Sequence, residues 1–71
     1  MNKTLDPKEI GRRLRELRGI RTRPGVAKEL GISYSALSKY EIGAKSPSDA
    51  MKVRLADYYG VSVQSIFFDP R

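Results

Sequence analysis

The chain contains no cysteine and no histidine among its 71 residues. Without cysteine, no disulfide can form and no thiolate can bind a metal. Without histidine, the commonest zinc ligand and the commonest general base are both missing. No cluster of paired acids replaces them. The sequence therefore predicts a protein that is not an enzyme and that carries neither a cofactor nor a metal.

Long apolar runs are missing as well. No stretch approaches the roughly 18 apolar residues of a membrane span, and the N-terminus has no apolar centre of a signal peptide. We therefore expect a cytoplasmic protein. A chain of 71 residues has room for one domain, residues 1–71, with a thin core.

Positive charge is plentiful, and it is placed unevenly. The formal net charge is +6, and residues 1–28 hold nine basic and three acidic side chains, whereas the two signs balance over residues 29–71. Such asymmetry indicates a face for an anionic partner: a nucleic acid, an acidic membrane surface or an acidic protein. The alternative is an ordinary solvated helix face.

Start and stop signals predict five short helices and no strand. The first helix starts after the capping Asp6, at Pro7, and ends at Gly19. The second starts near Pro24 and the third is capped by Ser33. The expected ranges are 7–18, about 24–30, 34–41, 47–59 and about 63–67. In the fourth, Ser46 is expected to cap and Pro47 to take the first position. Its apolar side is assigned to Met51, Val53, Leu55, Ala56 and Tyr59.

Residues 23–42 combine two of these helices around a turn at Gly31. The small side chain of Ala27 lets the second helix of the pair approach the first closely. The following helix, 34–41, is slim and polar on its outer side, which is what the major groove of DNA admits. This arrangement predicts a helix-turn-helix unit.

Four segments carry a resemblance to a known family: IGRRLRELR (10–18), VAKELGISYSALSKYEIG (26–43), SPS (46–48) and LADYYGVSVQSIF (55–67). They resemble the Cro/C1-type helix-turn-helix family of phage repressors and their bacterial relatives. The resemblance implies an all-α, five-helix, lambda-repressor-like domain. It also implies a transcriptional regulator, expected to be a repressor and to be associated with the nucleoid. Its partner would be a two-fold double-stranded DNA operator, bound as a homodimer with the helix 34–41 in the major groove.

The resemblance also implies roles for particular residues. It places base contacts at Tyr34, Ser35 and Lys39, with Ser38 as a further candidate, and a buried ion pair between Arg18 and Glu41. Arg23 stands where the family usually has a phosphate-binding glutamine, and an arginine can also hold phosphate.

The residues themselves suggest further contacts. Arg13 and Lys45 are candidates for phosphate, Lys45 because it lies beside a helix N-terminus. The run Ile66, Phe67 and Phe68 is more apolar surface than so small a core is expected to cover. We therefore expect the last helix and the tail, 61–71, to form a dimer interface.

Two other functions remain open at this point. The chain could be a protein-interaction module, for example an antitoxin-like partner, but the outer face of helix 34–41 would then be apolar or acidic. It could instead bind RNA or a membrane surface through its basic first third. That use needs interleaved aromatic residues or a strong amphipathic face, and residues 1–28 contain no aromatic residue.

Overall fold

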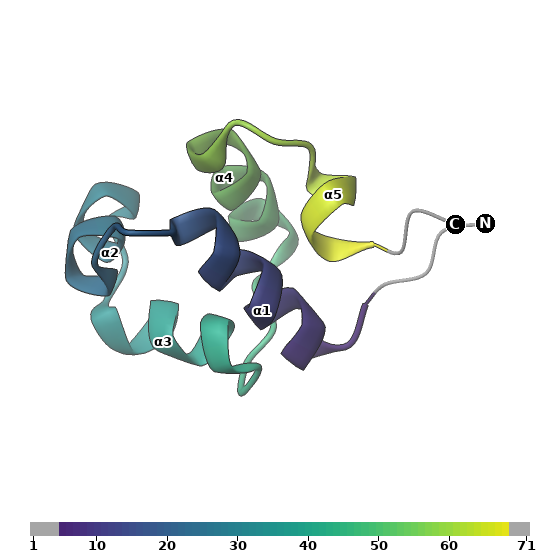
Figure 1. Ribbon diagram of the computed structural model, residues 1–71, viewed down its shortest axis with the longest axis horizontal. Coiled ribbons are helices and arrows are strands. Elements are labelled where there is room, and N and C mark those ends of the chain that lie inside the picture. Colours follow the sequence, from purple (N-terminus) through teal and green to yellow (C-terminus); the bar gives the residue numbers. More distant parts are fainter. Residues whose placement is uncertain (1–4, 69–71) are drawn as a thin grey trace.

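The computed structural model describes residues 5–68 of the chain. This part of the chain forms five α-helices and no strand: α1 (Pro7–Arg18), α2 (Arg23–Leu30), α3 (Tyr34–Ile42), α4 (Asp49–Tyr59) and α5 (Val63–Phe67). Figure 1 shows their arrangement. The all-helical, five-helix class that the sequence predicts is confirmed. None of these described helices is long and apolar enough to cross a membrane.

Each helix begins at a polar side chain that accepts a hydrogen bond from the backbone N–H three residues later. These capping residues are Asp6, Thr22, Ser33, Ser48 and Ser62. A cap of this kind stabilises a helix by about 1 kcal/mol, because it satisfies a backbone donor that the helix leaves free. Short helices are marginal alone, so these caps fix where each one starts.

The start of α4 corrects one prediction from the sequence. The capping residue is Ser48 rather than Ser46, and its hydroxyl accepts from Met51 N–H at 3.2 Å. Pro47 is therefore outside the helix, where its ring is buried, and Asp49 occupies the first helical position. Ser46 and Ser48 both fit the local pattern of a capping serine. The helix starts after Ser48, because this leaves the apolar ring of Pro47 free to pack.

Every helix contributes side chains from one of its sides to the hydrophobic core. Its buried apolar residues are Ile10, Leu14, Val26, Ala27, Leu30, Leu37, Tyr40, Leu55, Ala56, Ile66 and Phe67. Helix α1 lies at the centre and packs against both α3 and α5, while α4 packs against α5 and α2 (Figure 1). Val53, which the sequence assigns to the apolar side of α4, is instead 50% exposed.

Helices α1 and α3 approach each other closely at two glycines. A Cβ atom on Gly11 would lie 2.2 Å from the carbonyl oxygen of Glu41, well inside van der Waals contact. A Cβ on Gly43, whose φ is 80°, would lie 2.9 Å from Cα of Lys8. Arg15 also donates a hydrogen bond to the Glu41 carbonyl. The C-terminal end of α3 is thus held by the backbone of α1 and by the side chain of Arg15.

Candidate nucleic-acid interface

Helices α2 and α3 form a unit with a tight turn between them. Gly31 ends α2 in the left-handed conformation, with φ of 71°. Ile32 N–H then donates to the Ala27 carbonyl at 3.0 Å, and Ser33 caps α3 immediately afterwards. Ala27 is 3% exposed, so its small side chain lies in the core. The turn leaves α3 with one face on the core and the other toward solvent.

The outward side of α3 is formed by residues at helical spacing, with about 100° between successive residues. This outer arc consists of Tyr34, Ser35, Ser38, Lys39 and Ile42. The opposite side holds the buried Leu37, Tyr40 and Glu41. The sequence had named the first four members of the arc as candidate base contacts, and the structure places them on one side of the helix. Their contacts with DNA stay a prediction.

Ile42 is the member that the sequence analysis missed. The helix was expected to end at Glu41, whereas α3 extends to Ile42 and is capped by Gly43. Ile42 is 56% exposed, almost the same as Tyr34 at 53%. The signal was present in the spacing, because Ile42 follows Ser38 by four residues and Tyr34 by eight.

Tyr34 and Ser38 lie close together at the start of the arc. The Ser38 hydroxyl and, next in importance, the Arg23 guanidinium lower the pKa of the Tyr34 phenol. The oxygen of Ser38 is itself buried. A base contact by Ser38 would therefore require its hydroxyl to turn outward.

A buried carboxylate joins α3 to two arginines. Glu41 is fully buried, and its Oε2 accepts from Arg18 Nε at 2.9 Å while its Oε1 accepts from Arg23 Nε at 2.8 Å. The resemblance implied a pair between Arg18 and Glu41, and the structure contains that pair with Arg23 as a second cation. Arg18 also donates from Nη1 to the Arg21 carbonyl at 2.7 Å, which braces the turn before α2. These contacts hold both helices of the unit to α1.

Arg23 therefore has a different setting from the one expected. Its Nε is bound to Glu41, and the side chain is 28% exposed. Hydrogen bonding to Glu41 and then to Tyr34 raises the pKa of Arg23, so the group stays charged. A phosphate contact through its remaining nitrogens stays a prediction.

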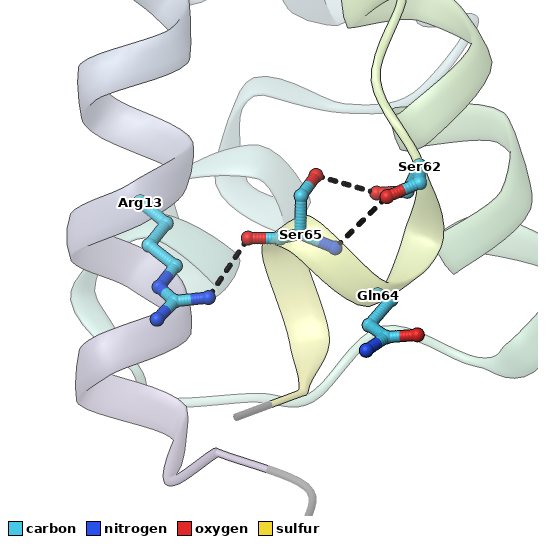
Figure 2. A pocket seen from close by; sticks show the side chains of 4 residues that line it. All are labelled: Arg13, Ser62, Gln64 and Ser65. Atoms are coloured by element: carbon cyan, nitrogen blue, oxygen red, sulfur yellow. Dashed lines mark hydrogen bonds between the residues drawn. The ribbon is translucent and has the colours of Figure 1, made fainter. Parts of the chain in front are cut away.

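Arg13 lies on the α5 side of α1. Its Nη1 donates to the Ser65 carbonyl at 2.8 Å, across a pocket lined also by Ser62 and Gln64 (Figure 2). It makes a further contact with Glu9 at 3.3 Å. Figure 1 shows α5 and α3 on different sides of α1. The phosphate role that the sequence suggested is untested, and these contacts give Arg13 a structural role in joining α1 to α5.

Lys39 and Lys45 are both exposed and lie close to the end of α3. Lys45 follows the helix, and its N–H is bound to the Lys39 carbonyl at 3.3 Å. Within residues 5–68 neither lysine takes part in an ion pair. One uncompensated positive charge, Lys39, therefore lies within the outer arc, and a second, Lys45, lies beside its C-terminal end.

The residues proposed for a dimer interface need a correction. Ile66 and Phe67 are fully buried in the core of the single chain, so their apolar surface is already covered. The core is large enough because α5 folds back onto α1 and α4. Only Phe68 is partly exposed, and Lys52 Nζ lies 6.0 Å from its ring centroid. The tail at 69–71 is outside the described residues.

The pKa of Tyr59 depends on its burial and on the nearby charge of Glu41. Its hydroxyl is buried without a partner in the described part of the chain, and burial, followed by the negative charge of Glu41, raises the pKa of Tyr59 to about 12. Ionisation should therefore cost stability as the pH rises from about 10, the ordinary value for tyrosine, to about 12. Below pH 10 this contribution is fully present, because the phenol is then neutral in both states.

We expect an ultraviolet absorbance titration to show Tyr34, whose pKa is lowered, ionising before Tyr59, whose pKa is raised. The replacement Tyr59→Phe should remove the later of these two steps and leave the earlier one in place. A titration in which Tyr34 and Tyr59 ionise together, below the pH at which the fold is lost, would contradict this order.

Comparison with known proteins gives one match. A family described as "Helix-turn-helix domain" matches residues 9–65, which include all of α2, α3 and α4. No curated protein and no solved structure matches the chain.

Proposed function

Because the chain belongs to the helix-turn-helix domain family, we propose that it is a sequence-specific regulator of transcription that inserts α3 into the major groove of double-stranded DNA. The observation that carries this proposal is the outer arc of α3. Apart from the buried Ser38 hydroxyl, the arc faces away from the core; it contains Lys39 and lies beside Lys45. The other side of α3 is held by Glu41 and the close contact at Gly11. A helix fixed in this way can present side chains to base edges without losing order.

Within this family, we place the chain with the Cro/C1-type proteins and propose that it acts as a repressor. Binding of α3 to an operator would exclude other proteins from the same groove. We further propose a homodimer whose two recognition helices are about 34–36 Å apart, matching half-sites one helical turn apart. Since Ile66 and Phe67 belong to the core, the dimer contact would use Phe68 and the exposed side of α5.

The experiment starts from selection of bound sites out of a random duplex pool. Affinity for the selected operator and for a scrambled duplex is then measured across a salt series. Lys39→Ala and Tyr34→Ala should lose about 1–3 kcal/mol of discrimination, because these side chains face base edges. Lys45→Ala should weaken binding to both duplexes alike and lower the salt slope by about one unit, because phosphate carries no sequence information.

Arg12→Gln is the matched control for loss of charge. Arg12 is paired with Glu9 and Glu16 on α1, so its replacement should change the salt slope less than that of Lys45. Equal loss of affinity for both duplexes in Lys39→Ala and Tyr34→Ala would exclude α3 as the reading helix. A wild-type chain that selects no sequence would exclude the function itself.

A further inference from the structure

Four large apolar side chains are half exposed or more in the described part of the chain. They are Ile20, Tyr34, Ile42 and Val53. Single exposed apolar residues are common on protein surfaces, so exposure alone carries no meaning. The position of Ile42 is different, because it lies on the outer arc of α3 together with the polar residues proposed to contact DNA.

Tyr34, Ser38 and Ile42 form one row along this arc, at intervals of four residues. With a rise of 1.5 Å per residue, the two ends of the row are about 12 Å apart. The hydroxyl in the middle of the row, that of Ser38, is buried. The row therefore offers an aromatic ring at one end and an aliphatic side chain at the other, with little polar surface between them.

The place of Ile42 is fixed by its neighbours in the chain. Glu41 before it is bound to two arginines, and Gly43 after it lies against the backbone of α1 at Lys8. The side chain of Ile42 is not among those packed against the core. It is thus an exposed apolar group held at a defined point of the recognition surface.

An isoleucine can neither donate to a base edge nor bind a phosphate. The apolar feature that base pairs present in the major groove is the C5-methyl group of a pyrimidine, which thymine always carries and 5-methylcytosine also has. We propose that Ile42 is a specificity-determining residue that packs on such a methyl group. The inference rests on the proposed function and extends the set of reading residues to the C-terminal end of α3.

The test removes one methyl group at a time. In the selected operator, each thymine is replaced in turn by deoxyuridine, which lacks only the C5-methyl group. For the wild-type chain, one position in each half-site should lose about three- to five-fold in affinity, the value of one buried methyl group. Ile42→Ala should bind the thymine and deoxyuridine duplexes equally well at that position.

A second set of duplexes tests whether the methyl group is read when a 5-methylcytosine carries it in place of a thymine. Replacing the same T·A pair by C·G should weaken wild-type binding, and methylation of that cytosine at C5 should restore part of the affinity. Restoration shows that the methyl group itself is read. The inference would be overturned if the wild-type chain bound the thymine and deoxyuridine duplexes equally well and if methylation of the cytosine restored no affinity.

Val53→Ala is the matched control, since Val53 is a β-branched residue of similar exposure on α4, off the outer arc. It should leave the deoxyuridine profile unchanged. Ile42→Val should retain most of the sensitivity, and thermal melts should show that both Ile42 variants fold. If Ile42→Ala keeps the full deoxyuridine penalty, the inference fails while the proposed function stands. If the wild-type chain does not prefer the operator to a scrambled duplex, both fail.

Discussion

Replacement of Gly11 by alanine is expected to lower the free energy of unfolding by at least about 2 kcal/mol. In an isolated helix the same change would stabilise by about 1 kcal/mol, because alanine restricts the unfolded chain more than glycine does. Here the new Cβ would lie 2.2 Å from the Glu41 carbonyl oxygen and 3.0 Å from that of Tyr40. Both atoms belong to the backbone of α3, so they can give way only if the whole helix moves. The steric cost therefore exceeds the gain in helix propensity.

Urea denaturation of the wild type and of two glycine variants would measure this effect. Gly25→Ala is the control, because Gly25 is also helical and its nearest neighbour is the side-chain oxygen of Thr22 rather than backbone. We expect Gly25→Ala to change stability by less than about 1 kcal/mol. A stabilising Gly11→Ala would mean that α1 and α3 are farther apart than the structure has them. Because the new Cβ would displace α3 from α1, and α3 is proposed to contact DNA, Gly11→Ala should also weaken binding to the operator.

Replacement of Glu41 by alanine is the second change with a large expected effect, about 3 kcal/mol of lost stability. It leaves a cavity at a fully buried position and removes the shared acceptor of Arg18 and Arg23. The two arginines are 17% and 28% exposed, so water can solvate them in part, and the cost stays near the lower end for buried pairs.

The two arginines should not behave as independent partners. After Arg18→Ala, Glu41 keeps the bond from Arg23, and after Arg23→Ala it keeps both bonds from Arg18. Each single variant should therefore cost less than Glu41→Ala. The double variant leaves a buried carboxylate without a cation, and its cost should exceed the sum of the two single costs. Additive losses in a double-mutant cycle would show that the two arginines act separately.

Much of the fold could be predicted because its signals are local. Capping residues, prolines at helix starts and glycines at helix ends depend on neighbours within four residues, and they placed all five helices. The start of α4 was wrong by two residues because Ser46 and Ser48 both satisfy the local rule. The choice between them depends on burial of Pro47, which is a tertiary contact.

The rest of the site depends on packing between helices, which local patterns do not record. Nothing in the spacing of Arg23 shows that Glu41 would accept from it, eighteen residues farther along the chain. The apolar run at the end of the chain was interpreted as a dimer surface because the size of the core was underestimated; α5 returns to α1 and buries Ile66 and Phe67. Gly11 did leave a signal, since a glycine inside a helix is unfavourable unless another backbone comes close.

The division of α3 into an anchored side and an outer arc makes the domain suited to retargeting. Ser35, Lys39 and Ile42 are not part of the core, so their side chains can be exchanged at little cost to folding. Gly11 and Glu41, by contrast, keep the helix in place whatever the arc carries. Libraries randomised at these three positions alone should therefore yield many folded variants with new operator preferences. The same freedom would let binding preference drift through single substitutions without a loss of stability on the way.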